Sequence, residues 1–138
     1  MESIAKGVKP KILFADDDLL MHRLYGPHIE RAGYEMIGAT DGSDAIMLAE
    51  SEQPQVVVMD IVMPGTDGVA AILKIKQADT TKDIPIIAIS GNPEFHCLRQ
   101  QLAGVGVELF LPKHFSPAKL VSEIRRLDPS LTESAGAI

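Results

Sequence analysis

Carboxylates follow two short apolar runs in the chain. The run KILFA leads directly into Asp16, Asp17 and Asp18, and the run QVVVM leads directly into Asp60. Two like charges about 4 Å apart repel by roughly 4 kcal/mol at an effective dielectric near 20, so acids gathered at one place call for a cation. Oxygen-only ligation by small acids suits Mg²⁺ or a similar hard ion such as Mn²⁺. The pattern therefore predicts a divalent-metal site.

The apolar runs before these acids must be neighbouring strands if the acids are to meet. Apolar runs alternate with segments in which apolar residues recur every three or four positions. This alternation predicts βαβ units and an α/β fold, with a parallel sheet covered on both faces. The carboxyl ends of parallel strands line the crevice where such sheets bind ligands. The expected strands are Lys11–Ala15, Glu35–Ala39, Gln55–Met59, Ile84–Ser90 and Glu108–Leu111.

Two further polar residues stand at strand ends. Ser90 ends the fourth expected strand, and Lys113 follows the fifth, so both should lie over the same edge as the acids. The loop after Asp60 reads IVMPGTDG, whose proline and glycines favour a tight turn before the next helix.

Several residues are suited to start or interrupt the expected helices. Asp41, Asp67 and Ser116 have the side chains of helix N-caps, and Asp18 is expected to cap the first helix rather than bind the metal. The first helix, Leu19–Arg31, contains Pro27. Because an interior proline costs about 3 kcal/mol and kinks a helix, we expect a bend or break there.

Length, composition and charge narrow the class of protein. The 138 residues suit one domain, and a net charge of −6 argues against binding to nucleic-acid phosphates. A single cysteine, Cys97, excludes an internal disulfide and is expected to be a small, partly buried apolar residue. No apolar stretch is long enough to span a membrane, and the N-terminus does not read as a signal peptide, so a cytoplasmic location is expected.

Four motifs in order resemble the receiver domains of two-component response regulators, especially single-domain chemotaxis regulators. They are ADD at 15–17, MDIVMPGTDG at 59–68, IIAISG at 86–91 and PKHF at 112–115. The resemblance covers about residues 9–128 and implies one receiver domain, with residues 1–8 and 129–138 expected to be flexible termini. It also implies a flavodoxin-like, doubly wound (βα)5 fold with a five-stranded parallel sheet in the order 2-1-3-4-5.

The same resemblance implies a role for each site residue. Asp60 would accept a phosphoryl group. Asp17, Asp60 and the backbone carbonyl of Val62 would ligate Mg²⁺, and Asp16 would act largely through water. Ser90 would bind a phosphoryl oxygen, Lys113 would pair with Asp60 and later with the phosphoryl group, and Phe110 would move in the switch.

Two positions depart from the family pattern. His114 stands where the family usually has a cis proline, and because a cis bond before a non-proline residue costs about 2.5–4 kcal/mol, we expect a trans bond. Val62 is apolar where many members carry a polar side chain, so we expect slow loss of the phosphoryl group. The histidines show no metal-ligand spacing and are expected at the surface: His22, His28, His96 and His114.

The resemblance implies signalling rather than an enzymatic role beyond self-phosphorylation and autodephosphorylation. A histidine kinase or phosphotransfer protein would donate the phosphoryl group, and an effector protein or domain would read the face formed by the fourth helix, fifth strand and fifth helix. That face would include Arg99, Gln100, Lys119 and Glu123. With no DNA-binding module after Arg126, output by protein contact is expected, with no nucleic acid or membrane bound through this domain.

Two alternatives stay open at this point. The triplet Asp16–Asp18 also fits the D-x-D opening of haloacid-dehalogenase-type phosphatases, although Leu20 and the lack of a cap domain argue against them. A phosphorylation-independent interaction module is the other alternative, because His114 and Pro27 are unusual.

Overall fold

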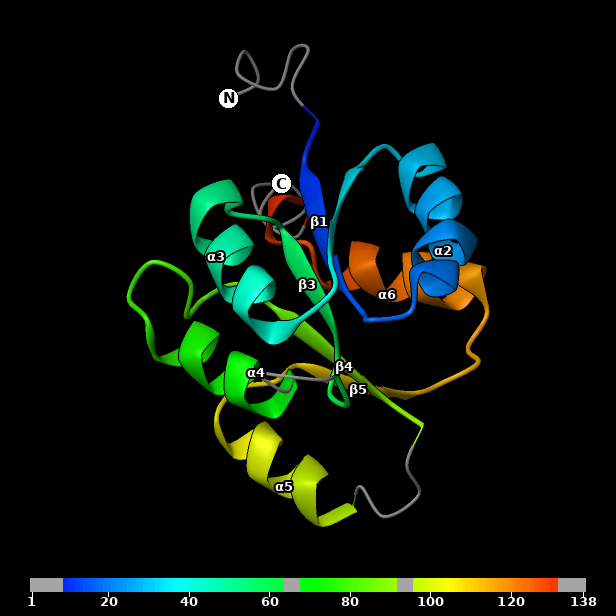
Figure 1. Ribbon diagram of the computed structural model, residues 1–138. Helices are drawn as coiled ribbons and strands as arrows, with labels where there is room; N and C mark the ends of the chain where they lie inside the picture. The colour runs from blue at the N-terminus through cyan, green and yellow to red at the C-terminus, as the bar shows by residue number, and fades with distance from the viewer. Residues whose placement is uncertain (1–8, 64–67, 92–95, 132–138) are drawn as a thin grey trace.

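The strands assemble into one parallel sheet with helices on both faces (Figure 1). The computed structural model describes residues 9–63, 68–91 and 96–131, with residues 96–99 described by their backbone alone. The sheet has five strands in the order β2-β1-β3-β4-β5, and every pairing is parallel. This confirms the predicted doubly wound, flavodoxin-like topology.

The elements alternate along the chain as predicted. Their bounds are β1 Lys11–Ala15, α2 Leu19–Arg31, β2 Glu35–Ala39, α3 Gly42–Glu52, β3 Val56–Asp60, α4 Gly68–Gln77, β4 Ile86–Ser90, α5 His96–Gly104, β5 Leu109–Pro112 and α6 Pro117–Leu127. Strands β1 and β2 have the predicted bounds, whereas β3, β4 and β5 begin one or two residues later. Asp60 belongs to β3 because it still pairs with Ile89 of β4.

The core consists of two apolar layers on opposite faces of the sheet. Alternation along β1 sends Ile12 and Phe14 to one face and Leu13 and Ala15 to the other. The first layer packs under α2 and α6, and the second packs under α3, α4 and α5 (Figure 1). Burying one large apolar side chain stabilises the folded protein by about 1.5–3 kcal/mol. Because a shift of one residue in a strand would move its apolar side chains to the wrong layer, this burial keeps the strands in register.

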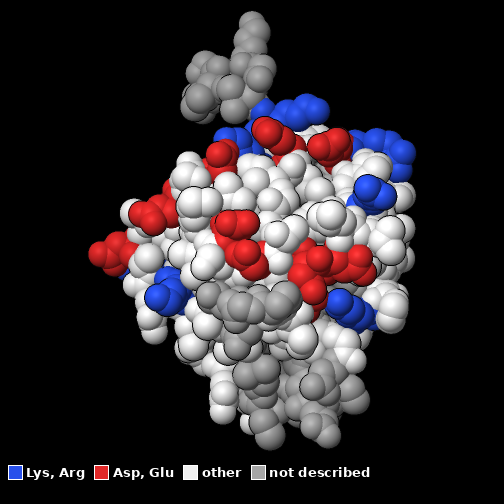
Figure 2. Space-filling model, in the orientation of Figure 1, with Lys and Arg blue, Asp and Glu red and all other residues white. Residues whose placement is uncertain are grey.

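The surface carries more acid than base. On the face seen in Figure 2, carboxylate side chains gather in the middle, and basic side chains lie mainly toward the upper and lateral edges. Among the described residues, no helix is long and apolar enough to cross a membrane.

Side-chain caps begin three of the helices. The carboxylate of Asp18 accepts a hydrogen bond from the Leu20 amide, and Asp41 accepts one from the Asp44 amide. Ser116 Oγ accepts the Lys119 amide at the start of α6. These predicted caps are confirmed, whereas Asp67 lies outside the described residues.

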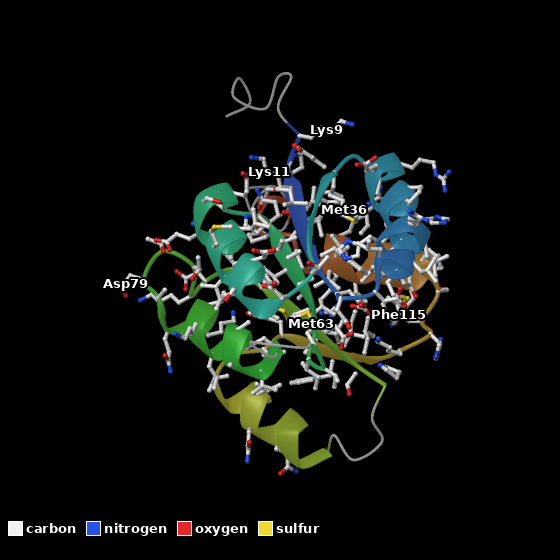
Figure 3. All side chains as sticks on the ribbon, in the orientation of Figure 1. Lys9, Lys11, Met36, Met63, Asp79 and Phe115 are labelled. Carbon is white, nitrogen blue, oxygen red and sulfur yellow. The ribbon has the colours of Figure 1, made fainter. Side chains whose placement is uncertain are left out.

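Helix α2 continues through Pro27, so the break that we allowed for there is wrong, and the bend stays a prediction. Pro27 and Arg23 are both exposed, and the missing backbone hydrogen bond therefore lies on the solvent side of the helix. The opposite face is fixed by packing, since a β-carbon at Gly26 would lie 3.1 Å from Met36 Cε. Met36 belongs to β2, and its side chain lies on the side of the sheet that α2 covers (Figure 3).

The end of the described chain is a hydrogen-bonded turn. The amide and hydroxyl of Ser130 both donate to Asp128 Oδ1, and the Leu131 amide donates to the Asp128 carbonyl. Residues 1–8 and 132–138, for which flexibility was predicted, lie outside the described residues.

Candidate functional site

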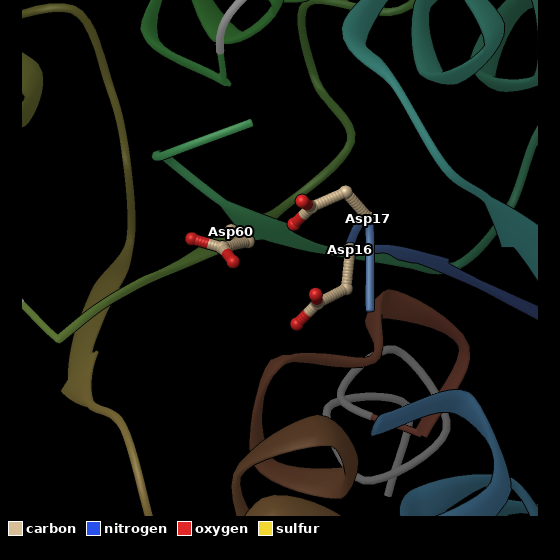
Figure 4. Close-up of side chains that lie close together, drawn as sticks. All are labelled: Asp16, Asp17 and Asp60. Carbon is tan, nitrogen blue, oxygen red and sulfur yellow. The ribbon is translucent and has the colours of Figure 1, made fainter. Parts of the chain in front are cut away.

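Three carboxylates meet at one edge of the sheet. Asp16 and Asp17 follow β1, and Asp60 ends the neighbouring strand β3. Their side chains lie near one another (Figure 4), and one oxygen from each lies within 4.8 Å of the others. Asp16 and Asp60 are each only 1% exposed, whereas Asp17 is open to solvent. The predicted gathering of acids is therefore present.

The surroundings of Asp16 disfavour the charged form of its carboxyl group. Its Oδ1 accepts the Asp18 amide at 2.9 Å. Burial raises the pKa of Asp16 above its usual value, and the neighbouring Asp60 carboxylate raises it further. A proton or a cation relieves this cost, and an all-oxygen donor set of this kind fits Mg²⁺ or Mn²⁺.

The two oxygens of Asp60 have different partners. Oδ1 accepts the Val62 amide at 3.0 Å, which closes a tight turn after β3. Oδ2 lies 3.0 Å from Lys113 Nζ in an ion pair, and the contact lacks the direction of a good hydrogen bond. Oδ2 therefore keeps unused acceptor capacity while facing a positive charge.

Lys113 reaches Asp60 from the end of β5. Its amide donates to the Ser90 carbonyl at 3.1 Å, and its side-chain stem lies alongside Gly91. Partial burial works to lower the pKa of Lys113, but the carboxylates of Asp60 and Asp16 outweigh it and raise that pKa above its ordinary value. The ammonium is thus charged at neutral pH.

Ser90 and Phe110 lie on the adjoining strands. Ser90 is 4% exposed and ends β4, where it pairs with Pro112 of β5. Phe110 pairs with Ala88, is half-buried and packs against the layer under α3, α4 and α5. The sheet therefore brings Ser90 to the same edge as the acids and Lys113, with Phe110 further back along β5.

The two departures from the family pattern have clear structural settings. The Lys113–His114 peptide is trans, as predicted, and His114 has a left-handed φ of 70°. The Val62 side chain is 62% exposed, and its amide is the donor to Asp60.

Of the histidines expected at the surface, His114 is exposed, His28 is half-buried, and the side chain of His96 lies outside the described residues. For His22 the expectation is wrong. It is half-buried, and its Nε2 lies 2.8 Å from the Asp16 carbonyl oxygen. Its ring and that of Phe14 form a T-shaped pair with centroids 5.2 Å apart. His22, Tyr25 and Ile29 share the inner side of α2 at three- and four-residue spacing, which is the sequence signal that could have revealed it.

Comparison with known proteins decides the family. Residues 12–125 match the family model of the response regulator receiver domain. The chain belongs to this family. A probable transcriptional regulator of Galdieria sulphuraria is 34% identical over 85% of this chain and 44% of its own length. The phosphate regulon regulator PhoB of Pseudomonas aeruginosa is 31% identical over 89% of this chain and 55% of its own length.

Solved structures agree with this assignment. The chemotaxis protein CheY4 of Vibrio cholerae is 26% identical, with a TM-score of 0.77 over 87% of this chain and 99% of that one. The chain spans about half the length of the curated relatives it matches. Receiver domains are signalling domains with an acidic Mg²⁺ site, which favours signalling over the phosphatase alternative.

Proposed function

We propose that this receiver domain accepts a phosphoryl group on Asp60 from a histidine kinase or a histidine phosphotransfer protein, in a Mg²⁺-dependent reaction. The observation that carries the proposal is the setting of Asp60. Its Oδ2 lies 3.0 Å from the Lys113 ammonium, while Asp16 and Asp17 each have a carboxylate oxygen within 4.8 Å of an Asp60 oxygen. A nucleophilic carboxylate oxygen that lies close to both a lysine ammonium and two carboxylates able to bind a metal ion is suited to phosphoryl transfer.

The transfer needs one bond made and one broken. An Asp60 carboxylate oxygen attacks phosphorus, the phosphorus–nitrogen bond of the donor phosphohistidine breaks, and its electron pair stays on the departing imidazole. The Val62 amide holds Oδ1 at 3.0 Å, which orients the carboxylate. Lys113 and the Ser90 hydroxyl stabilise the phosphoryl oxygens by charge and by hydrogen bonding.

The acids have a separate role. Asp16, Asp17, Asp60 and the Val62 backbone carbonyl would hold Mg²⁺, with Asp16 acting largely through water. The bound ion supplies positive charge that offsets the negative charge of the phosphoryl oxygens.

We propose that the signal leaves through the face formed by α5, β5 and α6. Ser90 and Lys113 would be drawn toward the phosphoryl group, and Phe110 would follow as part of the switch. On α6, Glu123 pairs with Lys119 and with Arg126, both at 2.7 Å. With Arg99 and Gln100 of α5, these residues would meet a downstream effector protein or domain.

Phosphorylation by acetyl phosphate tests the proposal directly. Wild type with Mg²⁺ should become labelled, and both Asp60→Asn and removal of Mg²⁺ should abolish the label. Asp79→Asn is the matched control, because Asp79 is 96% exposed and paired only loosely with Lys82 at 3.8 Å, and it should be labelled like wild type. Label on Asp60→Asn, or none on wild type, would contradict the proposal, and the second result would favour a phosphorylation-independent module.

A further inference from the structure

Lys113 reaches Asp60 through a turn that a histidine does not favour. The Lys113–His114 bond is trans, and His114 adopts a φ of 70°. Left-handed backbone is disfavoured for residues with a β-carbon, so it persists only where the surroundings hold it. The contacts on either side of His114 must therefore keep the turn in place.

The turn is fixed at three points. Before it, the Lys113 amide donates to the Ser90 carbonyl at 3.1 Å. After it, Ser116 Oγ accepts the Lys119 amide at 3.0 Å and begins α6. Between these points, the Phe115 carbonyl accepts a 2.6 Å hydrogen bond from the Tyr25 hydroxyl, 90 residues earlier in the chain. The Phe115 ring also stacks on Tyr25, with centroids 4.8 Å apart and planes 19° from parallel.

Tyr25 is a rigid support for this contact. It is 1% exposed on the inner side of α2, and its ring also lies 5.8 Å from that of Phe14. Burial raises the pKa of the Tyr25 hydroxyl, and the charge of Asp16 raises it further, so the hydroxyl remains a donor at neutral pH. Phe115, its partner, lies beside α2 (Figure 3).

Packing alone does not account for the hydroxyl. A phenylalanine at position 25 would fill the same space, and a buried hydroxyl is tolerated only when it is bonded. This hydroxyl bonds the carbonyl two residues beyond Lys113, on the far side of the left-handed residue. Its contact therefore acts on the segment that aims the lysine.

We propose that Tyr25 is a positioning residue for Lys113, fixing the trans turn through Phe115 so that the ammonium rests against Asp60 Oδ2. The consequence for phosphorylation rests on the proposed function, because Lys113 matters there only through its contact with the Asp60 carboxylate. The consequence for the Lys113–Asp60 ion pair is independent of it.

The variant Tyr25→Phe tests the positioning role, since it removes the hydroxyl and keeps the ring. The first readout is the NMR signal of the Lys113 side-chain ammonium in the unphosphorylated protein. We expect Tyr25→Phe to move this signal toward its value in Asp60→Asn, where the ion pair is lost. An unchanged signal overturns the proposal.

The second readout is the rate of labelling by acetyl phosphate at saturating Mg²⁺. Tyr25→Phe should slow labelling about three- to tenfold, the range expected for loss of one hydrogen bond. In a Lys113→Ala background the same substitution should have no further effect, because Tyr25 acts through the lysine. An equal slowing with and without Lys113 would mean a purely structural role and would overturn the proposal.

Two further variants keep the test decisive. Tyr34→Phe is the matched control, because Tyr34 is also a buried tyrosine and donates to Asp128 Oδ2 at 2.7 Å, away from the turn. It should change neither readout. Phe115→Leu removes the ring stack but keeps the carbonyl, so it should shift the Lys113 signal partway even if Tyr25→Phe does not fold. If wild type is not labelled but the Lys113 signal still depends on Tyr25, the proposed function fails and the positioning role stands.

Discussion

Gly68, the first residue of α4, lies directly against the backbone of the candidate phosphoacceptor Asp60. A β-carbon at position 68 would overlap the Asp60 carbonyl oxygen and the Ile61 α-carbon. Both neighbours are backbone atoms at the buried end of β3, so they cannot move aside cheaply. The absence of a side chain at Gly68 therefore allows α4 to begin immediately beside the end of β3 that carries Asp60.

Gly68→Ala should accordingly destabilise the protein by about 1–3 kcal/mol, the usual cost of overpacking. Urea denaturation measures the change in the free energy of unfolding. Gly104→Ala in α5 is the matched control, because nothing lies within 4 Å of the added β-carbon, and it should be neutral or slightly stabilising. Equal stability of Gly68→Ala and wild type would contradict the close approach.

The left-handed backbone of the exposed residue His114 predicts that a glycine at this position gives a more stable protein than a valine does. His114→Val should destabilise the protein by roughly 1–2 kcal/mol, because a β-branched residue fits a φ of 70° poorly. His114→Gly should cost far less, since glycine adopts positive φ without strain. Thermal unfolding of the three proteins tests this order, and a valine variant as stable as the glycine variant would exclude a strained turn.

The raised pKa of Asp16 predicts opposite effects of Asp16→Asn on stability and on metal binding. Because the folded-state pKa lies above the unfolded value, metal-free stability is lost as pH rises through that folded-state pKa, and the penalty remains at pH 7. Asp16→Asn should remove this pH dependence and stabilise the metal-free protein. It should also weaken Mg²⁺ binding about tenfold, equivalent to ~1.4 kcal/mol.

Thermal shift with and without Mg²⁺ separates these effects. Mg²⁺ at 100 times its Kd should stabilise wild type by about 2.7 kcal/mol, and the same concentration should stabilise Asp16→Asn less. An equal response of the two proteins would show that Asp16 contributes nothing to the metal site.

The buried pair of Tyr34 and Asp128 predicts a loss of stability in alkali. Burial and the hydrogen bond to Asp128 raise the pKa of Tyr34 well above its usual value of 10. Above pH 10 the unfolded chain loses this proton and the folded protein keeps it, so the contribution of Tyr34 is present below pH 10 and declines as pH rises further. Tyr34→Phe should show a shallower decline in urea denaturation between neutral pH and pH 11, and an unchanged slope would refute the assignment.

The exposed Val62 side chain predicts slow dephosphorylation. At 62% exposure it offers no polar group to orient a hydrolytic water near Asp60. Val62→Asn should shorten the lifetime of the phosphoryl group without changing stability. Met47→Asn is the matched control, because Met47 is 58% exposed on α3 and should leave the lifetime unchanged. Equal lifetimes for Val62→Asn and wild type would remove the idea.

The alternation of apolar runs and helical segments was enough to predict the sheet and the residues at its edge. Asp16, Asp60, Ser90 and Lys113 each stand at the end of a parallel strand or directly after one, and such ends coincide whatever the details of packing. The backbone geometry of a parallel sheet is therefore enough to bring most of the candidate site residues together. The trans bond before His114 was likewise predictable, because its preference is local to the peptide.

Other features depended on contacts between distant segments. The hydrogen bond from Tyr25 to Phe115 joins residues 90 apart, and no local pattern specifies the distance between α2 and the turn after β5. The half-buried His22 and the unbroken helix through Pro27 also depend on how α2 packs against β1 and β2. Local chemistry and strand periodicity thus determined which residues meet at the candidate site, whereas packing between helices and turns decided how Lys113 is held against Asp60.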